Sequence, residues 1–143
     1  MVVAGEALMF QGDAQQPLRR FALWRTVGLL FVVWVIYESL TPSPIETPGI
    51  EFGDKIGHFS AYFMMMMWFA QLYRRSRHLV LLVGFIAMGV ALEFVQEQTG
   101  YRAFEYADML ANSLGASVAW LLAGGTFSSL LLRLEQRLFV TSR

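Results

Sequence analysis

The chain of 143 residues contains no cysteine. This absence excludes disulfides, thiolate metal sites and thiol nucleophiles together. Charged residues are also scarce at 15%, whereas 56% of the residues are hydrophobic, which is far from the composition of a soluble domain. The eleven basic and eleven acidic residues cancel, so bulk charge gives no reason to expect a nucleic-acid partner. The composition predicts a membrane protein with room for one domain.

Four stretches approach or exceed the roughly 20 apolar residues that a helix needs to cross a bilayer. They are Phe21 to Leu40, Ile56 to Tyr73, Leu79 to Val95 and Met109 to Leu132. We therefore predict an all-α, polytopic membrane protein with four transmembrane helices in a compact bundle. Residues 1–18 are expected to form an N-terminal tail and residues 19–143 a single domain. No small-x-small cleavage site follows the first span, so we expect it to be an uncleaved signal anchor.

The distribution of arginine and lysine predicts the orientation, because these residues in short flanks are retained on the cytoplasmic side. Most of them flank the N-terminus, the second connection and the C-terminus: Arg19, Arg20, Arg25, Arg74, Arg75, Arg77, Arg133, Arg137 and Arg143. Only Lys55 and Arg102 remain for the other two connections. Both termini are therefore predicted to be cytoplasmic.

Polar side chains gather at one end of the last three spans. The three sets are Asp54, Lys55 and His58, then Glu93, Gln96 and Glu97, then Asp108 and Asn112. With the predicted topology, all three sets lie on the extracytoplasmic side. Residues at four-residue spacing share a helix face, and ionisable groups at the membrane edge tend to mark a functional site. One shared polar pocket is therefore expected.

Three of these side chains are candidate catalytic residues. His58 is a candidate general base or acid because histidine titrates near physiological pH. Glu93 is a second candidate for proton transfer, and Asp108 would orient His58 or bind a metal. Each has an alternative role. His58 could be hydrogen-bonded inside the bundle, Glu93 could form a structural ion pair with Lys55 or Arg102, and Asp108 could cap the amides of its helix.

Five further side chains are candidate ligand-binding residues: Asp54, Lys55, Gln96, Arg102 and Asn112. Lys55 and Arg102 could bind a phosphate or carboxylate or simply pair with neighbouring acids. Gln96 and Asn112 could orient a ligand or tie helices together. One histidine with scattered carboxylates fits magnesium or manganese at best, so the sequence leaves any metal or cofactor open.

Small residues and methionines predict helix packing. Ala111, Gly115 and Ala119 form a small-residue stripe on the fourth span, which lets another helix approach closely. Because the stripe lies beside Asn112, the polar groups are expected to point into the bundle. Met64 to Met67 cover every face of one helical turn, which favours lipid contact and packing over a soft-metal site.

These residues also carry a family resemblance. The pattern Asp54-Lys55-Ile-Gly-His58, Tyr62, Glu93-Phe-Val-Gln96, Tyr101-Arg102 and Asp108-Met-Leu-Ala-Asn112-Ser-Leu-Gly115 resembles the VanZ-like family of small membrane proteins, over about residues 50–122. The family's prototype contributes to teicoplanin resistance, and its members generally lack an assigned activity. The resemblance implies a multi-pass protein of the bacterial cytoplasmic membrane.

Two functions are compatible with these observations. In the first, an outward-facing polar pocket binds or modifies a cell-envelope molecule, either lipid-linked or peptidoglycan-related, with a link to glycopeptide resistance. In the second, the chain is a non-enzymatic scaffold or binding module, and the polar residues form a network that ties the helices together. A proton or ion pathway is less favoured, because the inner halves of the spans offer no second set of ionisable residues. Membrane lipids are expected partners in each case.

Overall fold

The computed structural model describes residues 18–42, 53–100, 104–124 and 126–139. Within these ranges the chain is helical and has no β-strand, which confirms the all-α prediction. The helices follow in the order α2 (Phe21–Leu40), α3 (Gly53–Leu72), η1 (Arg75–Arg77), α4 (His78–Gln98), α5 (Tyr106–Leu122), η2 (Thr126–Ser129) and α6 (Leu130–Phe139).

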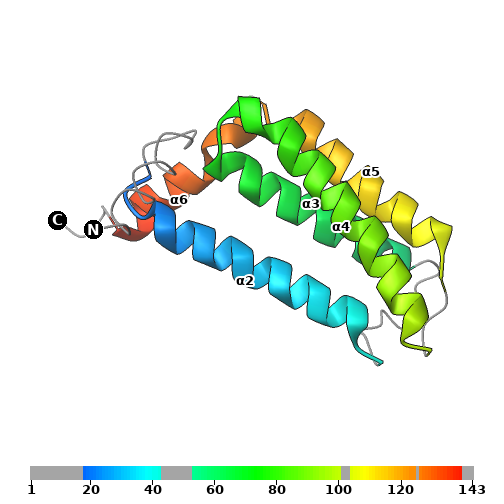
Figure 1. Cartoon of the computed structure of the whole chain (residues 1–143). Coiled ribbons are helices and arrows are strands. Elements are labelled where there is room, and N and C mark those ends of the chain that lie inside the picture. Colours follow the sequence, from blue (N-terminus) through cyan, green and yellow to red (C-terminus); the bar gives the residue numbers. More distant parts are fainter. Residues whose placement is uncertain (1–17, 43–52, 101–103, 125, 140–143) are drawn as a thin grey trace, which may run out of the picture.

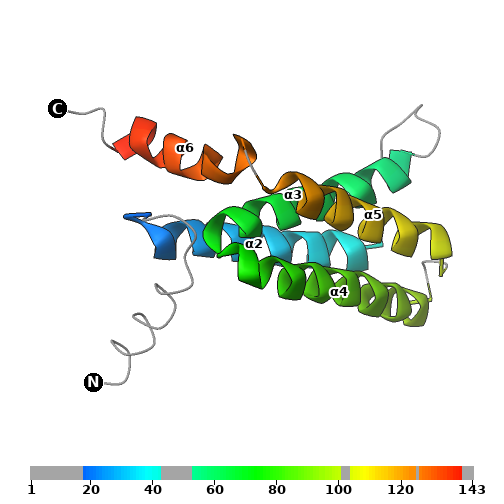
Figure 2. The same cartoon turned by 90° about the horizontal axis from the view of Figure 1, so that it is seen from above.

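Four long helices form a bundle, and α3 packs against the other three. Figures 1 and 2 show α2, α3, α4 and α5 packed together, with α6 crossing the end of the bundle where α2 begins. The most extensive helix pair is α3 with α5, and α3 also packs against α2 and α4. The bundle therefore has two ends. One holds the start of α2, the α3–α4 turn and α6, and the other holds the starts of α3 and α5.

Two helical stretches of the bundle are long and apolar enough to cross a membrane. At about 1.5 Å rise per residue, the 20 residues of α2 reach across the hydrocarbon layer. By length and hydropathy, two helical stretches of the described chain qualify as candidate spans, Phe21–Leu40 and Arg75–Gln98. The second predicted span overlaps α3, which carries more polar residues, and the first part of the fourth predicted span overlaps α5, which has 17 residues. Four transmembrane helices and cytoplasmic termini therefore stay predictions.

The fourth predicted span, Met109 to Leu132, is not one continuous helix. Helix α5 ends at Leu122, and after a break the chain forms η2 and then the separate helix α6. Gly124 follows the C-cap residue Ala123, and glycine costs about 1 kcal/mol relative to alanine inside a helix. The prediction rested on the absence of charged residues between Asp108 and Arg133, and a break without charge gave no signal against it.

The contact between α3 and α5 depends on a missing side chain. A Cβ atom placed on Gly115 of α5 would lie 2.9 Å from the carbonyl carbon and 3.1 Å from the Cα atom of Phe59 in α3. Gly115, Ala116 and Ala119 are all buried, and Ala111 is half-buried. The predicted close approach along this stripe is confirmed, and α3 is the helix that approaches.

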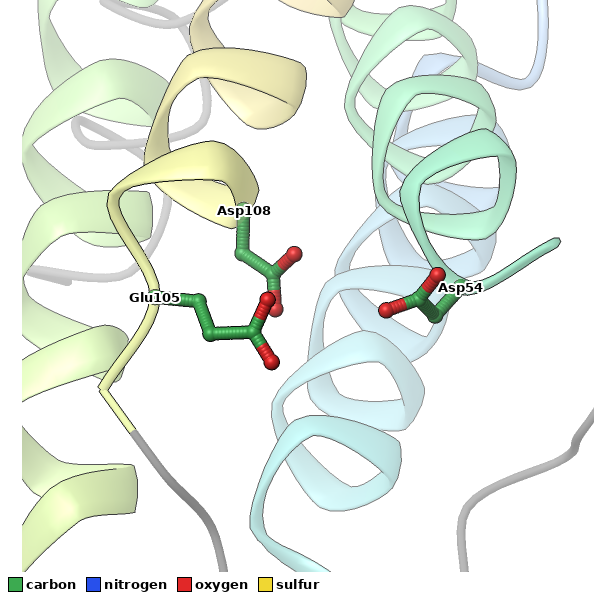
Figure 3. A group of neighbouring side chains, drawn as sticks. All are labelled: Asp54, Glu105 and Asp108. Atoms are coloured by element: carbon green, nitrogen blue, oxygen red, sulfur yellow. The ribbon is translucent and has the colours of Figure 1, made fainter. Parts of the chain in front are cut away.

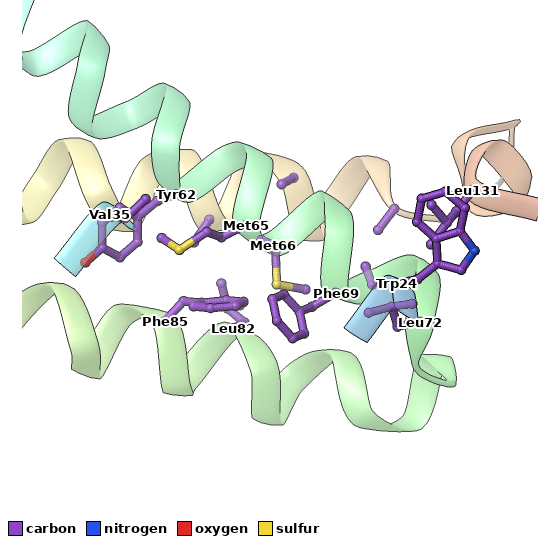
Figure 4. Packing of buried hydrophobic residues seen from close by; sticks show 14 of the residues in the cluster. Trp24, Val35, Tyr62, Met65, Met66, Phe69, Leu72, Leu82, Phe85 and Leu131 are labelled. Carbon is purple, nitrogen blue, oxygen red and sulfur yellow. The ribbon is translucent and has the colours of Figure 1, made fainter. Parts of the chain in front are cut away.

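The hydrophobic core runs along α3. Figure 4 shows Tyr62, Met65, Met66 and Phe69 of α3 facing side chains from the neighbouring helices. Met65 and Met66 are fully buried, whereas Met64 is 58% exposed. Burying a methionine side chain contributes roughly 1.5–3 kcal/mol. The methionine run therefore supplies both packing and an outward apolar surface, as the sequence indicated.

Large apolar side chains also cover the outside of the bundle. Leu30 and Val33 on α2 are 63% and 61% exposed, and Val80 and Val83 on α4 are 65% and 59% exposed. Monomeric soluble proteins rarely expose contiguous apolar patches of this kind. The outer faces of the two candidate spans therefore suit a lipid environment.

Candidate functional site: a polar cluster between two helix starts

The ammonium group of Lys55 lies among three carboxylates, and we call these four residues the Lys55 cluster. The Lys55 Nζ atom is 2.7 Å from a carboxylate oxygen of Asp54, 2.5 Å from one of Glu105 and 2.6 Å from one of Asp108. Figure 3 shows the three acidic side chains converging from the starts of α3 and α5. The side chains of Asp54 and Glu105 are 56% and 48% exposed, whereas that of Asp108 is 6% exposed. The cluster therefore reaches from the surface into the bundle.

Mutual pairing keeps the cluster charged. Asp54 and Lys55 precede the apolar part of α3, which begins at Ile56. The hydrogen bond from Lys55 holds the pKa of Asp54 below its ordinary value. Burial disfavours the charged form of Lys55, but hydrogen bonds to Asp108, Asp54 and Glu105 outweigh it and raise the pKa of the ammonium group. Both groups are therefore ionised at neutral pH.

His58 extends the Lys55 cluster by one helical turn, and both of its ring nitrogens have protein partners. Nε2 lies 3.3 Å from Asp108 Oδ2, and Nδ1 lies 3.1 Å from Asn112 Oδ1. An ionised carboxylate only accepts, so Nε2–H donates to Asp108. The Asn112 amide then accepts from Nδ1–H of an imidazolium or, with its amide turned, donates to Nδ1 of a neutral ring. Neither ring nitrogen points to an open ligand position.

Helix geometry explains why these residues meet. Asp108 and Asn112 are four residues apart in α5, and Asp54 and His58 are four apart in α3, so each pair shares a face. The close approach at Gly115 brings the two faces together. Asp108 and Asn112 are both buried, at 5% and 3% exposed.

The predicted capping role of Asp108 is wrong. The N-cap of α5 is Glu105, whose own side chain makes no capping bond and whose backbone N–H donates to Glu93 of α4. The Asp108 carboxylate contacts Lys55 and His58 instead. Its position in the first turn still suits the helix dipole. Tertiary ion pairing has replaced the local bond that the spacing indicated.

Glu93 occupies a neighbouring position on α4. Its side chain is almost completely buried, with 1% exposed, and its Oε1 atom accepts a 2.7 Å hydrogen bond from the backbone N–H of Glu105. The sequence suggested Lys55 or Arg102 as its partner. The bond to Glu105 ties α4 to the N-cap residue of α5, and Lys55 is surrounded by other acids. A pairing of Glu93 with Arg102 stays a prediction, because Arg102 lies outside the described residues.

The remaining predicted residues lie elsewhere. Gln96 is buried and donates a 2.6 Å hydrogen bond to the backbone carbonyl of Ser39, which ties α4 to the end of α2. Glu97 is exposed. Arg102 lies outside the described residues, so its role stays a prediction. The structure thus brings together the predicted residues Asp54, Lys55, His58, Asp108 and Asn112, and their roles in binding or catalysis stay predictions.

Glu105 is the member of the cluster that sequence reasoning missed. It lies three residues before Asp108 in a short polar connection, where an exposed acid is ordinary. The only available signal was its spacing from Asp108, which places both on one side of a helix start.

The three acids of the Lys55 cluster have the right chemistry for a hard cation. One carboxylate oxygen from each of Asp54, Glu105 and Asp108 lies within 4.8 Å of the others, and carboxylate oxygens suit magnesium or calcium. Lys55, however, already supplies a positive charge 2.5 to 2.7 Å from each of them. A metal ion would have to displace this ammonium group, so the donor set fits a lysine better than a metal.

A second polar region, at the opposite end of the bundle, was not predicted. Glu135 of α6 is 2% exposed and accepts hydrogen bonds from the backbone N–H groups of Arg19 and Arg20 and from the Trp24 indole, at 2.9, 2.8 and 3.1 Å. Because helix starts leave unpaired N–H groups, this carboxylate stabilises the beginning of α2. The sequence offered no signal for it, since Glu135 lies among arginines in a C-terminal segment.

Two buried polar side chains stabilise the same end. His78 Nε2 lies 3.0 and 3.1 Å from the backbone carbonyls of Ala70 and Tyr73 near the end of α3. Gln71 Oε1 accepts a 2.7 Å hydrogen bond from the Leu131 N–H at the start of α6. Both interactions satisfy helix-terminal backbone groups.

Comparisons with known proteins identify a family and a relative. A family model described as VanZ/LLP1 matches residues 8–129. An uncharacterized protein of Schizosaccharomyces pombe is 33% identical over 106 residues, which cover 71% of this chain and 65% of that relative. The chain thus spans about two thirds of the length of this curated relative. No solved structure matches significantly. Since the family model covers most of the chain, the protein belongs to the VanZ/LLP1 family.

Proposed function

We propose that this protein is a non-enzymatic membrane module of the VanZ/LLP1 family, in which the polar cluster fixes the arrangement of the helices. The bundle would lie in a bacterial cytoplasmic membrane as a multi-pass protein with both termini inside. The cluster would then face the extracytoplasmic side. The distribution of arginine supports this orientation: the described arginines lie at the α6 end, and Lys55 lies at the other.

The observation that carries the proposal is the pairing of His58. Its two ring nitrogens are occupied by Asp108 and Asn112, whereas a general base needs a nitrogen within reach of a substrate proton. The other polar side chains are also engaged with the protein. Lys55 contacts three acids, Glu93 accepts from a backbone N–H, and Gln96 donates to a backbone carbonyl.

Thermal melting in detergent tests this proposal. Glu93→Gln weakens the bond to the Glu105 N–H and should lower the melting temperature by about 5 °C, as expected for a loss of 1–2 kcal/mol in a domain of this size. Asn112→Ala should act in the same direction. Glu97→Gln is the matched control, because Glu97 lies one turn later on α4 and is exposed. Equal melting of the wild type, Glu93→Gln and Asn112→Ala would refute the structural role.

A second candidate is binding or modification of a lipid-linked or peptidoglycan-related envelope molecule at the same cluster. Its support is the exposure of the outer members: the side chains of Asp54 and Glu105 are half exposed, and that of His58 is 14% exposed. In this case a ligand would displace Asn112 from His58, and the His58–Asp108 pair would transfer a proton. The resemblance to the VanZ-like family links such a role to glycopeptide resistance.

Cells that express the protein distinguish the two candidates. The wild type and His58→Gln are compared for teicoplanin susceptibility, with membrane levels and melting temperatures measured in parallel. The envelope role predicts that His58→Gln loses protection while its melting temperature is unchanged. The scaffold role predicts that any loss of protection follows a loss of stability.

A further inference from the structure

Helix α6 has two different sides. Its ten residues span about 15 Å, which is half of a hydrocarbon layer, so it cannot cross a membrane. Leu131 and Glu135 face the protein and are 4% and 2% exposed. Leucines at four-residue spacing form an outward leucine stripe, with exposures of 43%, 42% and 59%: Leu130, Leu134 and Leu138.

Arginines border the leucine stripe. Arg133 and Arg137 of α6 are exposed and also lie four residues apart, on the side of the helix next to the stripe. Other exposed arginines lie at the same end of the bundle: Arg19, Arg20, Arg74, Arg75 and Arg77. The acidic residue that the structure describes on α6 is Glu135, which is buried and engaged with α2. The surface is therefore both apolar and cationic.

The position of α6 is fixed by specific contacts. Glu135 binds the N–H groups at the start of α2, and the Leu131 N–H donates to Gln71 of α3. The Arg20 guanidinium lies 4.1 Å from the centre of the Phe139 ring. In Figure 1 the chain changes direction after α5, and α6 runs obliquely toward the start of α2. The leucine stripe is thus held at the end of the candidate spans.

We propose that α6 is an interfacial helix that binds the surface of an anionic phospholipid bilayer. The leucine stripe enters the boundary between headgroups and acyl chains, and Arg133 and Arg137 bind lipid phosphates. Leucines on one face and basic residues beside them are what such helices require. A cavity of about 330 Å³ lined by Arg19, Arg20, Glu135 and Phe139 adjoins this surface. Its two arginines add to the attraction for anionic headgroups.

Charge favours a lipid surface over a second copy of the chain. Two α6 surfaces placed face to face would bring Arg133 and Arg137 of one copy against those of the other, and like charges repel. An anionic bilayer offers the opposite charge, and each basic residue near such a surface raises binding roughly fivefold, the equivalent of about 1 kcal/mol.

The absence of cysteine makes the test direct, because a single introduced cysteine carries one fluorescent label. Leu134→Cys reports on the leucine stripe. Ser76→Cys, in the exposed turn at the same end, is the matched control. Full-length protein is reconstituted into phosphatidylcholine vesicles with and without phosphatidylglycerol, and quenching by lipid-attached and by water-soluble quenchers is compared.

Lipid-attached quenchers should quench the label at position 134 but not the label at position 76. Phosphatidylglycerol should increase the quenching of the label at position 134 by lipid-attached quenchers. The double substitution Arg133→Gln and Arg137→Gln should return this quenching to the level seen in phosphatidylcholine alone. Water-soluble quenching at position 134 equal to that at position 76 would overturn the proposal. Shielding from both quenchers would do the same, because it would show that protein covers the stripe. Quenching that does not depend on phosphatidylglycerol would refute the role of the arginines.

Discussion

Gly115 of α5 packs directly against the backbone of Phe59 in α3, so that a side chain at position 115 would overlap the Phe59 carbonyl group. This contact sets the distance between the two helices whose starts carry the Lys55 cluster. The polar network therefore depends on an apolar crossing about two turns away.

Gly115→Ala should destabilise the protein by about 1–3 kcal/mol, because the added methyl group forces the two backbones apart. Gly84→Ala is the matched control: position 84 is in the interior of α4, and nothing lies within 4 Å of an added Cβ atom. The control should gain about 0.5–1 kcal/mol from helix propensity. Denaturation in detergent measures both. Similar effects of the two substitutions would show that the helices are not in close contact.

Lys55→Ala should destabilise the protein and create a divalent cation site. Removing the ammonium group leaves three carboxylate oxygens within 4.8 Å of one another, and we expect a loss of about 1–3 kcal/mol because only Asp108 is deeply buried. Calcium should then raise the melting temperature of the variant but not of the wild type. Lys55→Arg, which keeps the charge, is the control. Equal calcium effects on wild type and Lys55→Ala would contradict this assignment.

The Lys55 cluster also predicts how stability depends on pH. The pKa of Asp54 is lower in the folded protein than its ordinary value of 3.8, so its contribution is present above that pH and is lost as pH falls through the folded pKa. The pKa of Lys55 is raised above 10.5, so its contribution is present below that pH and is lost at higher pH. Because Asp54 is exposed, its share is small. Melting temperatures of the wild type and Lys55→Met are measured across pH. They should differ most between the ordinary pKa values of Asp54 and Lys55, 3.8 and 10.5. A constant difference at all pH values would argue against ion pairing.

Glu135→Ala should loosen the start of α2. The substitution removes the acceptor for two backbone N–H groups and for the Trp24 indole, with an expected loss of about 1–2 kcal/mol. Hydrogen exchange should become faster at the amides of Arg19 and Arg20, while exchange in the middle of α4 stays unchanged. Uniformly faster exchange would indicate global destabilisation and not the loss of a helix cap.

Much of the architecture could be predicted because membrane helices have a strong sequence signal. The prediction for α2, Phe21 to Leu40, coincides with the observed helix, since a long apolar run ends at a proline-rich segment. The break between α5 and α6 was not predicted, because the fourth span was inferred from the absence of charge between Asp108 and Arg133, and the break contains no charged residue. Hydropathy measures transfer into lipid, whereas helix continuity depends on backbone conformation.

The polar cluster was predicted only in part. Four-residue spacing correctly placed Asp54 with His58 and Asp108 with Asn112, because a helix fixes such pairs locally. Contacts between residues on different helices could not be predicted in this way. Glu105 was missed, and the Asp108 carboxylate pairs with Lys55 and His58 and not with the amides of its own helix.

The helical class, the apolar surfaces and the concentration of arginine in three flanking segments could be read from the sequence, because each follows from local composition and helical periodicity. The three acids around Lys55, the two partners of His58 and the contact of Glu135 with a helix more than a hundred residues earlier became visible only in the folded chain. These contacts depend on where separate helices cross. The crossing is set by the close fit at positions such as Gly115 and Phe59, which no single segment of the chain contains.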